Sequence, residues 1–229
     1  MPEPVSIGLL TTSVVAGLIR YAKRKFQQVK PVFDAVAASI LLVMFGWLIG
    51  LVALLVKLFD GGPVIYGQVR VGKEGQLFEM YKFRTMPDDA ETASGPIWAS
   101  DEDPRATRLG RMLRKSHLDE LPQLLNVIKG EMSLVGPRPE RPHFVEQLSG
   151  ALPEYPKRLA VKPGITGLAQ VNHRAEQDLS DSRKKLQFDL MYINSMCWAT
   201  DFRILLATLG KVKPGKAGDE PRTSVTSDS

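Results

Sequence analysis

The longest apolar stretch of the chain covers residues 35–56 and contains no charged side chain. As a helix these residues would extend roughly 33 Å, enough to cross a bilayer core of about 30 Å. Basic residues stand at positions 20, 23, 24, 25 and 30 before the stretch and at 57, 70 and 73 after it. Because cytoplasmic flanks hold the excess of Lys and Arg, this symmetry favours a helix that enters the membrane and returns to the same face. A helix that spans the bilayer remains the alternative.

A second apolar stretch, residues 6–19, is too short to span a membrane comfortably. Together with the basic run at 20–25, it favours an interfacial helix that meets anionic lipid headgroups. The alternative is a helix that packs on a partner or on the soluble part of the chain.

The rest of the chain alternates between strand-like, loop-like and helix-like patterns. Residues 64–71 and 77–83 are separated by a Gly-containing turn and predict a β-hairpin. Residues 87–105 are rich in Asp, Glu, Gly, Ser and Pro and predict a loop. Helical spacing of apolar residues then returns, and the last residues are polar and predicted to be disordered. The predicted helices cover residues 106–115, 116–130, 142–148, 176–195 and 198–209.

These elements predict an α+β fold that is mostly helical, with a small folded domain held at a membrane. A re-entrant membrane helix and interfacial amphipathic helices would provide the attachment. We divide the chain into an N-terminal apolar and basic extension (1–30), a membrane anchor helix (31–60), one folded domain (61–210) and a disordered tail (211–229).

Two adjacent carboxylates, Asp119 and Glu120, stand at the predicted start of the helix over residues 116–130. Ser116 with Asp119 predicts a capping box, and Pro122 is tolerated only in the first turn of a helix. The backbone N–H groups and the dipole at this end would lower the pKa of a carboxylate and attract phosphate. The simpler interpretation is that the two acids only favour the helix N-terminus, so their spacing alone does not establish a site.

Four cationic residues are candidates for binding phosphate beside these carboxylates. Lys82 and Arg84 end the second predicted strand, and Arg114 lies on a basic helix face that leads into the carboxylate pair. Arg138 stands between two prolines that restrict its backbone, and its planar guanidinium suits bidentate phosphate binding. For Lys82, Arg84 and Arg114, the alternative interpretation is an ordinary solvated surface position.

Composition narrows the classes of function. The chain of 229 residues has a formal charge of +5, which suits either nucleic acid or an anionic membrane surface. Its single cysteine, Cys197, excludes a disulfide framework and a cysteine-based zinc site. The three histidines are widely spaced and form no metal-ligand pattern. The sequence contains neither a P-loop nor a dinucleotide-binding fingerprint.

Four longer motifs occur in one order over most of the chain. They are Leu118-Asp119-Glu120-Leu121-Pro122-Gln123-Leu124, Lys129-Gly130-Glu131-Met132-Ser133, Gly136-Pro137-Arg138-Pro139 and Lys162-Pro163-Gly164-Ile165-Thr166-Gly167. With these motifs the chain resembles, over about residues 31–206, the bacterial sugar transferase family, the monotopic phosphoglycosyl transferases. It departs from that family at Gly46-Trp47, where the family's anchor bends at a Ser-Pro pair, and at Lys162, where the family usually has Arg.

The resemblance implies an enzyme that moves a sugar 1-phosphate from a UDP-sugar to polyprenyl (undecaprenyl) phosphate and releases UMP. Such a transfer initiates the synthesis of an exopolysaccharide or another glycoconjugate. The implied partners are the UDP-sugar, polyprenyl phosphate and membrane lipids, not nucleic acid, and a homodimer is compatible with them. The implied location is the bacterial inner (cytoplasmic) membrane, with the catalytic domain facing the cytoplasm.

The resemblance also implies roles for individual residues. Asp119 would form a covalent aspartyl-phosphosugar intermediate, Glu120 would act as metal ligand or base, and both would hold Mg²⁺. The residues implied to bind phosphate or substrate are Lys82, Arg84, Arg114, Arg138, Lys162, Gln170, Asn172 and Arg174.

Two other functions remain open at this point. A non-enzymatic membrane adaptor would explain the anchor and the charge, and a metal-dependent phosphodiesterase would use water as the acceptor. The sequence does not identify the donor sugar, although residues 139–142 resemble exopolysaccharide-pathway members that often use hexoses such as glucose or galactose.

Overall fold

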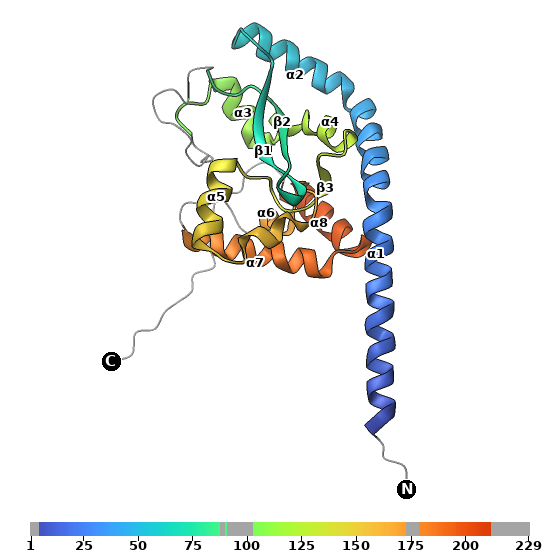
Figure 1. The fold of residues 1–229 in the computed structure, drawn as a ribbon. Coiled ribbons are helices and arrows are strands. Elements are labelled where there is room, and N and C mark those ends of the chain that lie inside the picture. Colours follow the sequence, from blue (N-terminus) through green and yellow to red (C-terminus); the bar gives the residue numbers. More distant parts are fainter. Residues whose placement is uncertain (1–4, 88–89, 91–102, 173–178, 212–229) are drawn as a thin grey trace, which may run out of the picture.

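The computed structural model describes residues 5–87, 90, 103–172 and 179–211. A long helix, α1 (Val5–Met44), runs along one side of a domain built from short helices and strands (Figure 1). The predicted loop at residues 87–105 and the predicted tail fall mostly outside the described residues. The predicted class, a mostly helical α+β fold, is confirmed.

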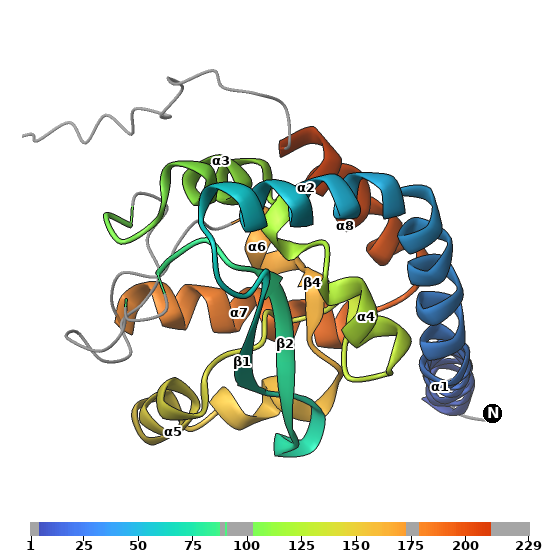
Figure 2. The ribbon, with the colours of Figure 1, turned by 90° about the horizontal axis from the view of Figure 1, so that it is seen from above.

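The apolar stretch 35–56 is divided between two helices rather than forming one. The first helix, α1, ends at Met44, and α2 (Gly46–Phe59) leaves in a different direction across the domain (Figures 1 and 2). The break at Phe45 adjoins Gly46-Trp47, the position at which the family's anchor bends at a Ser-Pro pair. Among the described residues, only the segment Tyr21–Met44 is long and apolar enough to cross a membrane.

The N-terminal extension is not a separate element. The stretch predicted as an interfacial helix at residues 6–19 belongs to α1, which continues without interruption through Pro31. The boundary placed between residues 30 and 31 therefore does not coincide with a break in the helix. The first part of the chain and the anchor as far as Met44 form one helix of 40 residues.

The predicted hairpin is confirmed. Strand β1 (Ile65–Val71) pairs antiparallel with β2 (Leu77–Phe83), from Ile65 opposite Phe83 to Val71 opposite Leu77. A single 3₁₀ turn, η1 (Lys73–Gly75), connects the two strands.

The predicted helices are found with shifted ends. They are α3 (Arg108–Ser116), α4 (Gln123–Ile128), α5 (Pro142–Ala151), α7 (Leu179–Ser195) and α8 (Trp198–Lys211). The 3₁₀ turns η2 (Leu118–Glu120) and η3 (Tyr155–Ala160) and the short helix α6 (Leu168–Asn172) complete the helical elements of the described residues.

A second small sheet was not predicted. Strand β3 (Ser133–Val135) pairs parallel with β4 (Gly164–Thr166), which brings two of the sequence motifs together. The backbones of Gly136 and Gly164 approach so closely that a Cβ on Gly164 would lie 2.1 Å from the Gly136 nitrogen. These glycines are therefore required by backbone packing.

Helices α1 and α2 each bury one face against the domain. Ala38 of α1 packs with Leu124 and Val135 in the main core, while Val56 of α2 packs against Phe83 in a second cluster. The opposite faces of both helices expose large apolar side chains. These include Val36, Ile40, Val43, Trp47, Leu51, Leu54 and Leu58.

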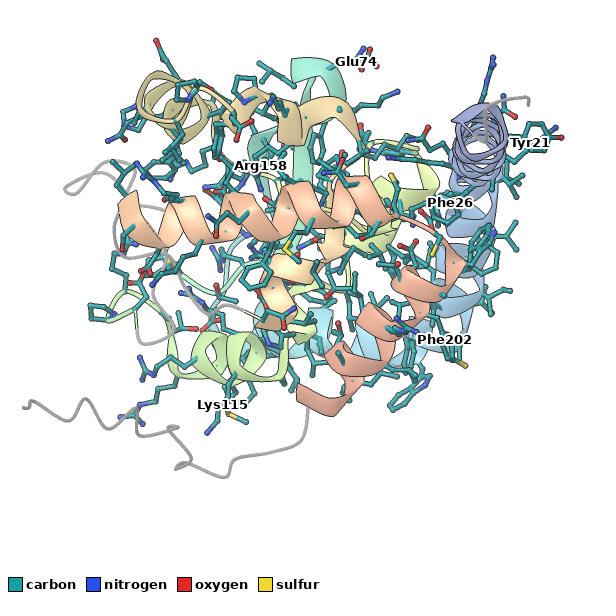
Figure 3. The ribbon with its side chains drawn as sticks, turned by 90° about the horizontal axis from the view of Figure 1, so that it is seen from below. Tyr21, Phe26, Glu74, Lys115, Arg158 and Phe202 are labelled. Atoms are coloured by element: carbon teal, nitrogen blue, oxygen red, sulfur yellow. The ribbon has the colours of Figure 1, made fainter. Side chains whose placement is uncertain are left out.

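A buried polar network fastens α1 to the domain. The Lys30 ammonium lies 3.3 Å from the Asp34 carboxylate and forms a second ion pair with Asp201 of α8. The hydroxyl of Ser133 donates to Asp34 over 2.6 Å, and the hydroxyl of Tyr192 donates to Asp201 over 2.9 Å. Next to this network, Phe26 of α1 meets the ring of Trp198 edge-on at 4.9 Å (Figure 3). The sequence suggested Lys30 only as part of a basic flank.

We expect Asp201→Ala to reduce the free energy of unfolding by about 3 kcal/mol, because Lys30 stays buried after losing one of its two partners. Chemical denaturation in mild detergent would measure this. A matched control is Glu154→Ala, which removes an exposed ion pair with Lys157 and should change the free energy by less than about 1 kcal/mol. Equal effects of the two substitutions would show that the network does not stabilise the docking of α1.

Candidate active site

The two carboxylates lie on a turn of their own between α3 and α4. His117 takes a left-handed conformation (φ 56°) that ends α3, and Asp119 and Glu120 follow in η2. The predicted capping box is wrong, because the Ser116 hydroxyl donates to the carbonyl oxygens of Met112 and Leu113 in the preceding helix. The acids therefore precede α4 instead of opening it.

Glu120 is held by two cations from different parts of the chain. Its Oε1 atom accepts hydrogen bonds from Lys82 Nζ at 2.7 Å and from Arg138 Nη2 at 2.8 Å. Burial alone would raise the pKa of Glu120, but the charges of Arg138 and Lys82 outweigh it and hold this pKa well below its usual range. Glu120 thus stays ionised and joins β2 to the segment after β3.

Asp119 has a different environment although it is the adjacent residue. It is buried, and its Oδ2 atom lies 3.8 Å from Lys82 Nζ. Within the described part of the chain its carboxylate accepts no hydrogen bond. Burial raises the pKa of Asp119, the charge of Lys82 opposes this, and the charge of Glu120 adds to it. The expectation that this pKa would be lowered is therefore wrong, because desolvation by burial is the largest influence on it.

The position of Lys82 depends on a buried asparagine. Asn126 of α4 is fully buried, and its side chain binds the edge of β2 as a neighbouring strand would. Its Oδ1 atom accepts from the Tyr81 N–H at 3.0 Å, and its Nδ2 atom donates to the Glu79 carbonyl at 2.7 Å. Lys82 is the next residue of β2, so Asn126 sets the distance between Lys82 and the carboxylates. The sequence analysis missed this residue.

A buried ion pair contacts the backbone of Arg138 and holds it in place. Arg158 donates from Nη2 to the Arg138 carbonyl at 2.8 Å, and it lies 2.8 Å from the Asp189 carboxylate. The Arg158 and Asp189 side chains are each 2% exposed, and Arg158 lies beside α7 in the interior (Figure 3). No spacing pattern in the sequence signals this pair.

The residues after Arg138 are also fixed by charge. Glu140 accepts from Lys185 of α7 at 2.5 Å and lies 3.6 Å from Arg70 of β1. Arg70 in turn donates to the Pro139 carbonyl at 3.0 Å. Burial lowers the pKa of Arg70 to about 10, and the charge of Glu140 opposes this. The segment that carries Arg138 is thus bound on one side to α7 and on the other to the hairpin.

Three other predicted phosphate-binding cations have contacts away from the carboxylate pair. Arg84 donates to the backbone carbonyl oxygens of Asp60 and Gly61, and Arg114 lies 4.0 Å from the Asp103 carboxylate. The ammonium of Lys162 lies beside Gly130, at the far end of α4 from Glu120. The part of these residues in phosphate binding stays a prediction.

The predicted polar loop is only partly described. Gln170 donates to the Ile165 carbonyl and Asn172 to the Leu168 carbonyl, each over 2.8 Å. Arg174 lies outside the described residues. Of the predicted substrate-binding residues that the structure describes, Lys82 and Arg138 form ion pairs with the carboxylate pair.

The carboxylates fit a magnesium ion that is shared with a substrate. The described residues contain no group of three or more His, Cys, Asp or Glu side chains that would hold a metal by themselves. Mg²⁺ typically binds through one or two carboxylates and completes its shell with water and substrate phosphates. Asp119 and the adjacent Glu120 would supply the one or two carboxylates, and water and substrate phosphates would supply the other ligands.

Comparison with known proteins identifies similar sequences over most of the chain. The profile described as bacterial sugar transferase matches residues 25–214. A UDP-N-acetylgalactosamine-undecaprenyl-phosphate N-acetylgalactosaminephosphotransferase of Aeromonas hydrophila is 42% identical over 82% of this chain. A UDP-glucose:undecaprenyl-phosphate glucose-1-phosphate transferase of Caulobacter vibrioides is 40% identical over 79% of it. The matched region makes up 44% of the first relative and 68% of the second.

We expect Lys82→Met to raise the pKa of Asp119 above its value in the unaltered protein, where it already exceeds the ordinary 3.8. The cation that favours the ionised form would be gone, so Asp119 would be protonated up to a higher pH. A ¹³C NMR titration of the aspartate carboxyl carbons would measure the shift.

Lys129→Met is the matched control, since Lys129 donates to Tyr81 at the surface and should leave the titration of Asp119 unchanged. An Asp119 midpoint below 3.8 in the unaltered protein would contradict the dominance of burial.

Proposed function

Since the chain belongs to the bacterial sugar transferase family, we propose that it transfers a sugar 1-phosphate from a UDP-sugar to polyprenyl phosphate. UMP is the other product. The observation that carries this proposal is the asymmetry of the carboxylate pair: Glu120 is bound by two cations, whereas Asp119 accepts no hydrogen bond from the described residues.

The reaction takes place in two displacements. An oxygen of the Asp119 carboxylate attacks the β-phosphorus of the UDP-sugar, and the bond from that phosphorus to the oxygen bridging the α-phosphate breaks. UMP leaves with the bond's electrons, and the sugar phosphate remains on Asp119. A phosphate oxygen of the polyprenyl phosphate then attacks the same phosphorus and releases the carboxylate. Covalent catalysis here separates a transfer between two anionic substrates into two steps.

Lys82 and Arg138 bind the negatively charged phosphates of the UDP-sugar. In the described structure both cations neutralise Glu120, and each has further donor atoms for phosphate oxygens. Glu120 keeps the two cations at a fixed separation beside Asp119. Its further role as metal ligand or base is part of the proposal.

Mg²⁺ is part of the proposal, with Asp119 and Glu120 as its protein ligands. When bound, it would offset the repulsion between the carboxylates and the diphosphate. The elevated pKa of Asp119 fits this arrangement, because the charge of Lys82 only partly offsets the effect of burial.

The apolar helices hold the site at the level of the lipid headgroups. On one side of the apolar stretch Asp34 accepts from Ser133, and on the other side Asp60 accepts from Thr107 over 3.0 Å. Both ends of the stretch thus contact the same domain, whereas a spanning helix would separate its ends by about 30 Å of hydrocarbon. These contacts support a re-entrant anchor in the cytoplasmic membrane, with the whole domain on the cytoplasmic side.

Incubation of the full chain with UDP-sugars, with and without polyprenyl phosphate, tests the function. UMP release that requires the lipid supports transfer. Hydrolysis that does not require the lipid would identify a phosphodiesterase, and the absence of any UMP would favour an adaptor. A panel that includes UDP-glucose, UDP-galactose and UDP-N-acetylgalactosamine would identify the donor.

We expect Asp119→Asn to reduce turnover to less than about a hundredth of the unaltered rate, because the amide cannot act as the nucleophile. The rate of UMP release in lipid-containing micelles would measure this, with thermal unfolding as the check on folding. The control Glu146→Gln makes the same chemical change at an exposed position of α5 and should keep full activity. Substantial turnover by Asp119→Asn would rule out the covalent intermediate.

A cysteine at position 29 and one at position 63 should both react with a membrane-impermeant maleimide from the cytoplasmic side, if the anchor re-enters. Val29 and Pro63 are both exposed and flank the apolar stretch. Position 62 is unsuitable, because Gly62 has a φ of 59° and a Cβ there would lie 2.5 Å from the Arg84 guanidinium.

The background for this labelling is Cys197→Ser, and Glu146→Cys marks the side of the folded domain. Labelling of position 29 only from the opposite side would establish a spanning helix. That result would leave the role of Asp119 unaffected.

A further inference from the structure

A groove next to the carboxylate pair has no part in the chemistry described so far. Residues 66–69 of β1 and residues 141–143 at the start of α5 enclose about 330 Å³. Figure 2 shows α5 on the β1 side of the hairpin. The volume is near the lower end of the range for ligand pockets, roughly 300–1,000 Å³, so it suits one portion of a nucleotide sugar rather than the whole molecule.

The hairpin relates the groove to the carboxylate pair through Lys82. Tyr66 stands opposite Lys82 in the hairpin, and cross-strand partners lie on the same face of a sheet. On the other wall, Arg141 follows Arg138 by three residues. Arg70, which donates to Gln68 of the groove, also interacts electrostatically with Glu120, Arg138 and Arg141. A donor whose β-phosphate lies at Lys82 and Arg138 would extend one of its ends into this groove.

The side chains of the groove combine a flat ring, an amide and positive charge. Tyr66 is 43% exposed, so much of its ring remains open to a ligand. Arg70 donates to Gln68 Oε1 at 2.5 Å, and Gln68 Nε2 reaches the Tyr66 hydroxyl at 3.4 Å, which orients the amide. Arg141 and the N-terminal end of α5, at Pro142, provide positive potential.

Charge decides which end of the donor enters. The nucleotide end of the donor, which includes the α-phosphate, leaves as a nucleoside monophosphate with about two negative charges, whereas the sugars of the three UDP-sugars named above carry no charge. A cationic groove with a stacking ring and an amide favours the nucleotide. A neutral sugar would gain little from Arg141 and the end of α5.

We infer that this groove binds the nucleoside of the donor, with its base on Tyr66, an amide contact from Gln68 and the α-phosphate towards Arg141. This inference rests on the proposed function for the identity of the donor. It assigns Tyr66 and Gln68 to the recognition of the leaving group.

Calorimetric titration of the full chain in detergent with Mg²⁺ tests the inference with two probes, UMP and inorganic pyrophosphate. Tyr66→Ala should weaken UMP binding about tenfold, as expected for the loss of one base–aromatic stack, and should leave the affinity for pyrophosphate within about twofold. Gln68→Ala should weaken UMP binding in the same selective way. Tyr81→Ala is the matched control, since Tyr81 lies in the same hairpin but contacts Lys129 outside the groove.

The inference is overturned if Tyr66→Ala and Tyr81→Ala affect UMP equally, or if the unaltered protein does not bind UMP. It is also overturned if UMP binding by Tyr66→Ala is intact while its preference among UDP-sugars changes, because the groove would then hold the sugar. Failure of the proposed function has a different signature. UMP would bind and depend on Tyr66, yet no UDP-sugar would be turned over with polyprenyl phosphate.

Discussion

The ion pairs of Glu120 hold the site together. Lys82 comes from the hairpin and Arg138 from the segment after β3, and without an acid between them the two neighbouring cations would repel each other. Glu120 compensates both charges and carries Asp119 on the same turn. This explains why one carboxylate of the pair is fully engaged while its neighbour stays available. Asn126 then holds β2, which carries Lys82, and the Arg158–Asp189 pair holds the segment after β3, which carries Arg138.

The anchor is part of the same assembly rather than an appendage. Lys30 and Asp34 of α1 are buried against α8 and β3, and β3 leads within three residues to Arg138. The opposite faces of α1 and α2 expose large apolar side chains. The depth of the helices in a membrane therefore determines the depth of the carboxylates. In the proposed reaction between a lipid phosphate and a water-soluble donor, this coupling would set where the two substrates meet.

The sequence predicted the parts that depend on local pattern. The hairpin and the helices at 142–148 and 198–209 are found. Lys82 and Arg138, which the resemblance implied as substrate-binding residues, lie beside Asp119 and Glu120. Tertiary contacts determined the rest. Ser116 ends one helix instead of starting the next because His117 adopts a left-handed conformation, and burial reverses the expected pKa shift of Asp119. Asn126, Arg158 and Lys30 each contact a residue 31 or more positions away in the sequence, and the spacing of residues along the chain does not predict such contacts.

The close approach of Gly136 and Gly164 has a consequence for how a ligand would be received. With 2.1 Å between a hypothetical Cβ and the opposing backbone, the two segments have no room to adjust, and the prolines beside Arg138 remove further freedom. The entropy of ordering this backbone is lost when the protein folds and not when a ligand arrives. Binding then has to immobilise only the guanidinium and the ligand itself. The affinity of Arg138 for a ligand would come from the preorganisation of its backbone. This affinity would fall with any substitution that loosens the packing between the two glycine backbones.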